Sequence, residues 1–440
     1  MKKVKNRAFS ALIIAFAVII GMGVYIYRYA LNAEAWATFT ADSQVVTNEG
    51  KLISGTVLDR NGALLAKAEN SEQSYSDDLL IRKATLHVVG DFPGNIGTGA
   101  LTAFADALSG YNPVTGITGE GGTVHLTIDA GINAVAYEAM AGRPGAVLVS
   151  NYETGEIICM VSTPSYDPLE GFDENDSAYS GAYLNRCISS AFTPGSVFKL
   201  VTVAAALEQL DNIYTRRFNC EGKTYVNGAE INCTGTHGEQ TIEQALSNSC
   251  NCAFAELSLA LGGETLASYA ESFGFTASHS LNGIDTKKGK FETFSSGSAG
   301  LAWSGIGQAT DLVCPYSMLR FTSAIANGGT AIEGSLICGE TGKMSTLLRP
   351  DTAEKLSEMM SYNVHTSYGT WLFPNLDMHA KSGTAEVGDG TSHSWFTGFI
   401  TNEGAPYAFT VIVEGAGSGL RNAGSVANTV LQALVTTNLE

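Results

Sequence analysis

A predicted helix begins in the stretch Ala191-Phe-Thr-Pro-Gly-Ser-Val-Phe-Lys-Leu200, which carries a serine and a lysine three residues apart. Pro194 and Gly195 interrupt the extended chain before it, and apolar residues recur at helical spacing from Ser196 to about residue 210. In the first turn, the serine hydroxyl lies near unpaired backbone N–H groups and the positive end of the helix dipole. Lys199 falls on the same face of the helix.

A serine and a lysine in this relation suit nucleophilic catalysis only if the lysine can lose its proton. A serine hydroxyl is a weak nucleophile until a base accepts its proton. A lysine can be that base when burial or a second cation nearby lowers its pKa. An isolated Ser-x-x-Lys match equally fits a capped helix with a solvated lysine. A second cation is therefore expected elsewhere in the chain.

The composition is that of a folded, acidic protein. The 440 residues are 45% hydrophobic and 15% charged, which is ample for two or three domains. The 25 Lys and Arg residues against 43 Asp and Glu residues give a formal net charge of −18. Such a surface repels nucleic acid, so we expect no nucleic-acid partner.

The N-terminus carries a predicted membrane anchor. Residues 8–27 contain no charge, and a helix of about twenty residues spans a bilayer core. Basic residues are more numerous before this run than just after it, which puts the N-terminus in the cytoplasm. A cleaved signal peptide is the alternative, but the apolar run is long for a signal. We expect a cytoplasmic tail over residues 1–7 and an uncleaved single-pass anchor over residues 8–28, with the catalytic domain outside the cell membrane.

Two extracytoplasmic regions are predicted after the anchor. Residues 29–122 form a small α+β pedestal or dimerisation-like region, with strands at 55–62 and 63–66 around an Asn-Gly turn. A strand at 87–90, a glycine-rich loop and a short helix at 101–108 complete it. No catalytic motif is found in this region, which we interpret as a spacer.

The second region covers residues 123–440 and opens at 123–129. A helix is predicted at 130–140, followed by strands at 145–150 and 156–161 that pair antiparallel. An acidic loop then leads to the helix that begins at Ser196.

Eight cysteines in an exported domain raise the question of disulfides. Cys220 and Cys233 bracket the polar segment 221–228, which is predicted as a hairpin with an Asn-Gly turn. They are predicted either as a disulfide or as two free thiols, because the sequence does not fix their geometry. Cys250-Asn-Cys252 suggests a metal, but no His and Cys set shows zinc spacing, so we expect no metal site.

Two further polar motifs follow in the chain. Ser249-Cys250-Asn251 is predicted on a loop between two helices. Lys381-Ser382-Gly383-Thr384 leads into three strand-like segments. Lys381 is the candidate second cation, Gly383 lets a ligand approach the strand edge, and Thr384 offers a hydroxyl and a backbone N–H. Taken alone, the first motif fits a helix cap and the second an exposed edge strand.

In this order, Ser196-x-x-Lys199, Ser249-x-Asn251 and Lys381-Ser-Gly383 resemble the known active-site signature of penicillin-binding proteins and serine β-lactamases. Other landmarks narrow the resemblance to class B penicillin-binding proteins, the monofunctional, membrane-anchored D,D-transpeptidases of peptidoglycan synthesis. They cover nearly the whole chain from about residue 51: Leu58-Asp-Arg-Asn-Gly62, Leu126-Thr-Ile-Asp129, Gly145-Ala-Val147, Thr154-Gly-Glu156, Ser165-Tyr-Asp-Pro168, Pro194-Gly-Ser196, Gly305-Ile-Gly-Gln308, Asn327-Gly-Gly329 and Trp395-Phe-Thr-Gly398.

The resemblance implies an α+β fold in which helices flank a five-stranded antiparallel sheet and an all-helical subdomain lies beside it. It implies that Ser196 attacks the carbonyl between the two terminal D-alanines of a donor stem peptide. Lys199 accepts the serine proton, and burial and the charge of Lys381 lower its basicity. The backbone N–H groups of Ser196 and Thr384 form the oxyanion hole.

The remaining motif residues receive roles from the same resemblance. Ser249 relays a proton to the departing D-alanine, and Asn251 orients the substrate amide and Lys199. Lys381 and the hydroxyl groups of Ser382 and Thr384 hold the terminal carboxylate.

The resemblance also implies the partners. An amine from a neighbouring stem peptide takes the acyl group and forms a cross-link, whereas β-lactam antibiotics leave Ser196 blocked. No cofactor is implied. A membrane glycan polymerase is the protein partner that the family suggests, and the oligomeric state is left open.

Two alternatives use the same chain differently. A D,D-carboxypeptidase or β-lactamase would employ the same residues with water as acceptor, but the anchor and the long chain speak against it. A catalytically silent scaffold would lack a motif residue. A penicillin sensor would carry a sizeable cytoplasmic domain. No motif residue is missing, and only seven residues precede the apolar run.

Overall fold

The computed structural model describes residues 2–41, 54–69, 72–109, 111–112, 116–117, 121–388 and 390–437. The first element is the helix α1 (Lys2–Ala41). Among the described residues, no helix has both the length and the apolar character that crossing a membrane requires. The anchor over residues 8–28 therefore stays a prediction from the sequence.

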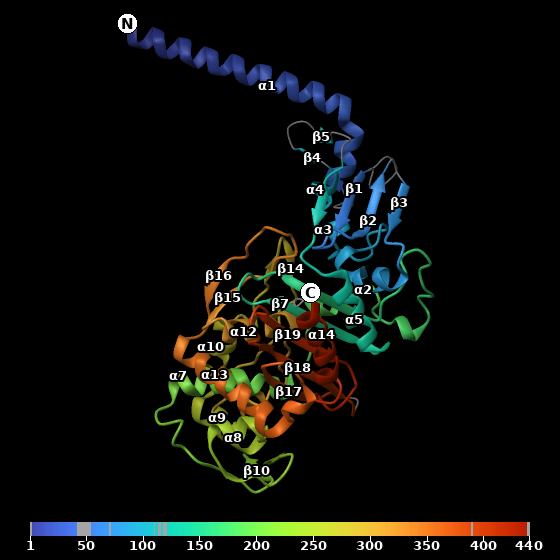
Figure 1. The fold of residues 1–440 in the computed structure, drawn as a ribbon. Coiled ribbons are helices and arrows are strands. Elements are labelled where there is room, and N and C mark those ends of the chain that lie inside the picture. The colour runs from blue at the N-terminus through green and yellow to red at the C-terminus, as the bar shows by residue number, and fades with distance from the viewer. Residues whose placement is uncertain are drawn as a thin grey trace.

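The region after α1 contains a four-stranded sheet in the order β3-β2-β1-β6 (Figure 1). β1 (Ser54–Leu58) and β2 (Leu64–Glu69) pair antiparallel around an Asn-Gly turn, as predicted. β3 (Glu72–Tyr75) lies at one edge, and β6 (Thr123–His125) runs parallel to β1 at the other. β6, the first strand of the predicted region 123–440, therefore belongs to the sheet of the preceding region.

Residues 87–90, predicted as a strand, instead end the helix α2 (Leu79–Val89), so that prediction is wrong. The Asp78 side chain accepts hydrogen bonds from the N–H groups of Leu80 and Ile81 and so caps the helix start. A short apolar run reads equally well as a strand or as a buried helix end. The Asp78 cap favours the helix.

A five-stranded antiparallel sheet in the order β17-β18-β19-β7-β8 organises the larger part of the molecule. Strands distant in sequence meet in it because β19 pairs with β7. The sheet confirms the implied fold and leaves β17 at one edge. Its strands are β7 (Gly145–Asn151), β8 (Ile157–Thr163), β17 (Met378–Glu386), β18 (Ser392–Ile400) and β19 (Tyr407–Val413).

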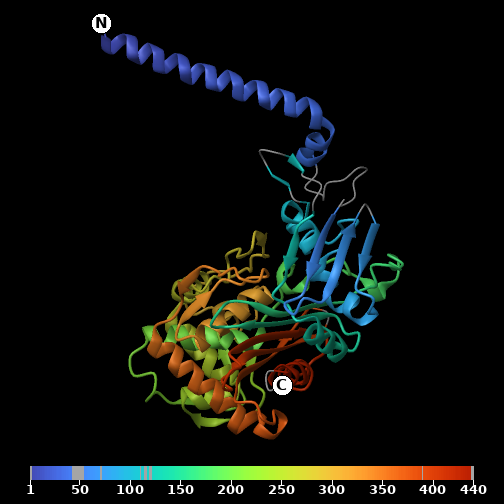
Figure 2. The ribbon, with the colours of Figure 1, turned by 45° about the horizontal axis from the view of Figure 1, so that its top comes forward.

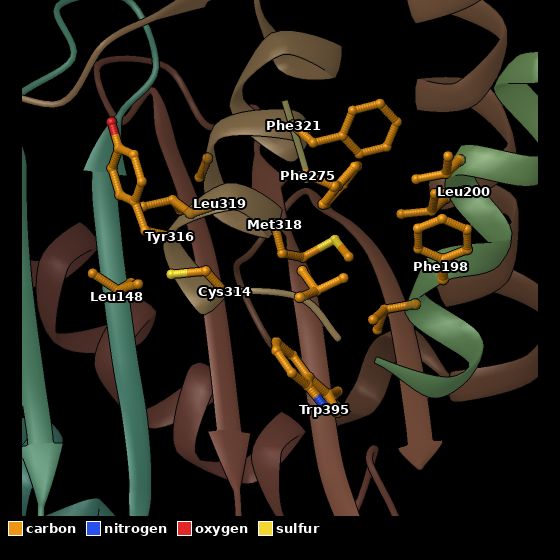
Figure 3. Packing of buried hydrophobic residues seen from close by; sticks show 14 of the residues in the cluster. Leu148, Phe198, Leu200, Phe275, Cys314, Tyr316, Met318, Leu319, Phe321 and Trp395 are labelled. Carbon is orange, nitrogen blue, oxygen red and sulfur yellow. The ribbon is translucent and has the colours of Figure 1, made fainter. Parts of the chain in front are cut away.

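Helices cover both faces of this sheet (Figures 1 and 2). α5 (Ala130–Met140) and α14 (Ala423–Thr437) pack on one face, in the buried cluster that contains Phe396. α12 (Pro315–Ala326) packs on the other face, in the cluster that contains Trp395 (Figure 3). Successive side chains of a strand point to opposite faces, so β18 contributes to both cores.

A group of helices lies beside the edge strand β17 (Figure 1). It comprises α7 (Lys199–Gln209), α8 (Ile242–Ser247), α9 (Asn251–Leu261), α10 (Gly263–Ser272) and α13 (Pro350–Asn363). The other described elements are α3 (Ala100–Ala103), α4 (Ala105–Ser109), β4 (Tyr111–Asn112), β5 (Gly116–Ile117), η1 (Ser177–Tyr179), α6 (Arg186–Ser189), η2 (Gly195–Phe198), β9 (Phe218–Cys220), β10 (Lys223–Val226), β11 (Ala229–Asn232), β12 (Gly238–Gln240), β13 (Ser280–Leu281), β14 (Ile284–Asp285), α11 (Ala299–Ser304), β15 (Thr330–Ile332), β16 (Met344–Thr346), η3 (Val364–Tyr368) and η4 (Thr370–Leu372).

The helix α2 joins the first region to the larger body. It packs against α5 and β8. Its Arg82 donates from Nε and Nη2 to the two carboxylate oxygens of Asp167, at 2.8 and 2.7 Å. Both side chains are almost fully buried, with 11% and 5% of their surface exposed. A two-point ion pair of this kind fixes orientation as well as distance.

Removing the arginine should therefore destabilise the protein. We expect Arg82→Met to lower the free energy of unfolding by about 3 kcal/mol, because it leaves the Asp167 carboxylate buried without its partner. Chemical denaturation of the purified protein measures this loss. Lys67→Met, which breaks the exposed Lys67–Glu69 pair, is the matched control and should cost less than about 1 kcal/mol. Equal losses in the two variants would contradict the role given to Arg82.

Candidate active site

The predicted helix start at Ser196 is present as one tight turn, η2, that continues into α7. Gly195 has a φ of +57°, a left-handed conformation that favours glycine, and its N–H donates to the Gly307 carbonyl at 2.8 Å. Val197 and Phe198 are completely buried, whereas Ser196 is half-buried. Within the described residues, the Ser196 hydroxyl makes no hydrogen bond. It is thus held on a rigid turn and left open to a reactant.

The turn of Ser196 packs directly against the edge strand β17. A Cβ atom added at Gly195 would lie 2.8 Å from the Thr384 carbonyl oxygen, and one added at Gly383 would lie 3.1 Å from the Pro194 carbonyl oxygen. Gly383 was predicted to let a ligand approach the strand. In the structure, the chain's own turn makes this close approach, which brings Ser196 and Thr384 together.

Lys199 lies fully buried beneath this turn. Its Nζ donates to the Ser249 carbonyl oxygen at 2.6 Å, to Asn251 Oδ1 at 2.8 Å and to Ser249 Oγ at 3.2 Å. The same ammonium group stands 5.2 Å from the centre of the Phe254 ring. The first two predicted motifs are therefore in direct contact.

Lys381 approaches the same hydroxyl from β17. Its Nζ donates to Ser249 Oγ at 3.2 Å and to the Ser382 carbonyl oxygen at 2.8 Å, and the side chain is fully buried. The Ser249 hydroxyl thus lies between two lysine side chains. Lys381 occupies the place expected of the second cation.

Burial changes the pKa of both lysines. Loss of solvent lowers the pKa of Lys199 to about 7, while the nearby thiols of Cys250, Cys233 and Cys252 act in the opposite direction. Burial also lowers the pKa of Lys381 well below its usual value, and the positive charge of Lys199 lowers it further. Two charged ammonium groups are therefore disfavoured here. One amine of the pair is readily available as a base.

The Ser249-Cys250-Asn251 motif lies between α8 and α9, as predicted. Ser249 has a φ of +50°, which a serine rarely adopts. The hydrogen bonds from Lys199 to its carbonyl and hydroxyl oxygens hold it in that conformation. In this backbone conformation the Ser249 hydroxyl lies between the two lysines.

Tyr368 is a site residue that sequence reasoning missed. The N–H and hydroxyl groups of Ser382 both donate to Tyr368 Oη, at 2.9 and 3.1 Å. Tyr368 ends a π-helical turn, η3, after α13, and no local sequence pattern indicated that turn. Ser382 and Lys381 point to opposite sides of the strand. The Ser382 hydroxyl is therefore positioned by Tyr368 and lies on the other side of β17 from the lysine pair.

Thr384 is exposed at the end of the motif, and its hydroxyl accepts a hydrogen bond of 3.4 Å from the N–H of Gly419. The arrangement as a whole offers a half-buried serine without a hydrogen-bond partner among the described residues, a buried amine that is partly neutral, and a hydroxyl that bridges two lysines. Such a set suits acyl transfer through a serine ester, because it can take a proton from one oxygen and return it to a leaving amine.

Cys220 and Cys233 are free thiols in the structure, so the disulfide is not observed. The hairpin between them is confirmed as β10 and β11, joined by Asn227 and Gly228. The sequence spacing gave no indication of a metal site, yet the fold gathers Cys220, Cys233, His237 and Cys250 with their ligand atoms within 4.8 Å of one another.

Comparison with known proteins gives the family. The family model of the penicillin binding protein transpeptidase domain matches residues 145–435, about two thirds of the chain. The chain therefore belongs to the penicillin-binding protein transpeptidase family, as its three motifs predicted.

Individual relatives agree with this assignment. Over 359 residues the chain is 28% identical to the peptidoglycan D,D-transpeptidase PbpA of Mycobacterium tuberculosis, covering 73% of this chain and 72% of that protein. The D,D-transpeptidase domain of a peptidoglycan glycosyltransferase from Eggerthella lenta is 26% identical, with a TM-score of 0.76 over 88% of this chain and 99% of that one. Penicillin-binding protein A of M. tuberculosis, as its ceftriaxone acyl-enzyme complex, shares the fold at 24% identity, with a TM-score of 0.72 over 86% of this chain and 98% of that one.

The contact between Gly195 and β17 can be tested by adding one methyl group. Gly195→Ala should lower the free energy of unfolding by about 2 kcal/mol more than Gly62→Ala. Both positions have a positive φ, but the space around Gly62 is open, whereas the new methyl at Gly195 would collide with Thr384 and Ala385. Chemical denaturation of the two variants separates backbone strain from the collision. Equal destabilisation would show that the turn at Gly195 is not in close contact with β17.

Proposed function

We propose that this protein is a peptidoglycan D,D-transpeptidase that works through an acyl-enzyme on Ser196. The observation that carries the proposal is the meeting of Lys199 and Lys381 on the Ser249 hydroxyl, beside a serine that is free to react. The family assignment and the relatives named D,D-transpeptidase support it.

Acylation begins with proton removal from Ser196 by the neutral form of Lys199. The serine oxygen attacks the carbonyl between the two terminal D-alanines of a donor stem peptide, and the C–N bond to the last D-alanine breaks. The departing amine takes a proton through Ser249, which contacts both lysines. Asn251 accepts a hydrogen bond from Lys199 and so holds the base in place. An amine of a second stem peptide then takes the acyl group and forms the cross-link.

Charge stabilisation comes from the turn and the strand that pack together. The backbone N–H groups of Ser196 and Thr384 bind the oxyanion of the tetrahedral intermediate. The terminal carboxylate of the donor lies at the Lys381-Ser-Gly-Thr384 strand. Its negative charge favours the protonated form of Lys381, which burial disfavours in the free protein.

β-Lactams use the same route to a stable product. Penicillin-binding protein A of M. tuberculosis forms an acyl-enzyme complex with ceftriaxone, and we expect a β-lactam carbonyl to acylate Ser196 of this chain in the same way. Hydrolysis of the acyl-enzyme by water is the activity of the carboxypeptidase and β-lactamase alternative. The scaffold alternative is disfavoured because every motif residue is present and both lysines contact Ser249.

The sequence supports a place at the membrane. We propose that residues 8–28 anchor the chain with its N-terminus in the cytoplasm and the catalytic region outside, and that residues 29–122 act as a spacer. A membrane glycan polymerase, which supplies the strands to be cross-linked, is the partner of this chemistry.

Whether an amine or water accepts the acyl group can be measured directly. With a synthetic donor ending in D-alanyl-D-alanine and an amine acceptor peptide, the full chain should release D-alanine and form an equal amount of cross-linked product. Ser196→Ala should abolish both, a loss of at least about 10³-fold in rate. Release of D-alanine without cross-linked product would favour the carboxypeptidase instead.

The pH dependence reports the state of Lys199. Because its pKa is lowered to about 7, most Lys199 is protonated below pH 7 and cannot accept the serine proton. The rate of acylation by a penicillin should fall about tenfold for each pH unit below 7 and level off above it. Stopped-flow fluorescence from pH 5 to about 9 measures the profile. Lys199→Arg keeps the charge but cannot act as a base at these pH values. A flat profile, or fast acylation in this variant, would contradict the assignment.

A further inference from the structure

Four potential metal ligands converge beside the Ser249-Cys250-Asn251 motif. Cys220 ends β9, Cys233 follows β11, His237 precedes β12, and Cys250 is the N-cap residue of α9. The pairing of β9 with β12 places Cys220 opposite Gly238, next to the histidine. Three separate segments therefore direct their ligand atoms to one point.

Three of the six distances within this cluster match the edges of a tetrahedral zinc site. Cys220 Sγ and Cys233 Sγ each lie 3.5 Å from His237 Nδ1, and Cys233 Sγ lies 3.8 Å from Cys250 Sγ. Zinc bonds of about 2.3 Å to sulfur and about 2.0–2.1 Å to nitrogen give tetrahedral edges of about 3.8 Å between sulfurs and about 3.6 Å between sulfur and nitrogen. The three given distances are thus close to those edges, and all four ligand atoms lie within 4.8 Å of one another.

The surroundings suit a soft metal ion. Cys220 and Cys250 are buried, and Cys233 and His237 are half-buried. The backbone N–H of Asn251 donates to Cys233 Sγ at 3.2 Å, the kind of contact that orients and stabilises a ligating thiolate. His237 also lines a polar hollow with Gln244 and Ser367, through which an ion can enter. Three sulfurs and one imidazole favour zinc over the hard cations.

We propose that Cys220, Cys233, His237 and Cys250 bind one zinc ion in a structural Cys3His site. On binding, the three thiols lose their protons to solvent and the neutral imidazole coordinates through Nδ1. All four positions of the tetrahedron are then filled by protein, which leaves no open position for catalysis. The site does not depend on the proposed transpeptidase activity.

The site has a consequence that does rest on the proposed function. Cys250 stands between Ser249 and Asn251, and Asn251 Nδ2 donates to the Asn232 carbonyl at 2.8 Å. A metal bound at Cys250 and Cys233 would tie the β10–β11 hairpin to the motif from two directions. Zinc would therefore fix the orientation of the two polar side chains that contact Lys199.

Metal analysis of the full chain tests the proposal. The protein is purified in detergent without reductant or chelator, and its metal content is measured by mass spectrometry. We expect about one zinc per chain. Replacement by cobalt(II) should give the visible absorption of a tetrahedral site together with a sulfur-to-cobalt charge-transfer band. Protein without zinc that takes up no cobalt, or a disulfide among these cysteines in peptide maps of alkylated protein, would overturn the site.

Variants identify the ligands. His237→Ala and Cys220→Ser should lower the zinc affinity at least about tenfold. Cys338→Ser removes a half-buried thiol outside the cluster and should retain full zinc, which makes it the matched control. Unchanged zinc in the first two variants would also overturn the site. If either variant fails to fold, the cobalt spectrum of the unmodified protein still decides.

The zinc proposal and the transpeptidase proposal can be refuted independently of each other. Metal content is determined without substrate, so its absence would leave the transpeptidase proposal intact. If zinc is present, chelation with loss of zinc should slow penicillin acylation about tenfold or more, and restored zinc should restore the rate.

Discussion

The burial of two lysine side chains around one hydroxyl is the constraint on which the rest of the site depends. Both Nζ atoms lie 3.2 Å from Ser249 Oγ. Two positive charges at most about 6.4 Å apart repel each other by about 3 kcal/mol at an effective dielectric constant of about 20. Desolvation adds to this cost. The pair therefore sheds a proton near neutral pH, and a serine beside it gains a base without any histidine.

Such a pair requires a scaffold that holds three distant segments rigidly. α7 supplies Lys199, the loop between α8 and α9 supplies Ser249, and the edge strand β17 supplies Lys381. The strand can lie close to the helix start because Gly195 and Gly383 carry no side chain where the two backbones meet. The proposed zinc site would add a second constraint on the same loop through Cys250. The Ser196 hydroxyl makes no hydrogen bond within the described residues.

Much of this arrangement follows from local sequence signals, and the remainder depends on contacts between distant residues. The helix at 130–140, the paired strands of β7 and β8, and a hairpin with an Asn-Gly turn in the segment 221–228 were predicted because periodicity and an Asn-Gly turn are local. The three motifs were recognisable for the same reason. Tyr368 was not, because its role arises only when a π-helical turn reaches Ser382. The cysteine cluster was missed because its ligands are spread over thirty-one positions, from 220 to 250, and only the fold joins them.

The measurement that tests the central claim most directly is the intact mass of the full chain after incubation with benzylpenicillin, followed by peptide mapping. A chain in which the lysine pair activates Ser196 gains one drug mass, located on the peptide that contains Ser196. An unmodified chain with intact drug, or an adduct on another residue, would contradict the account.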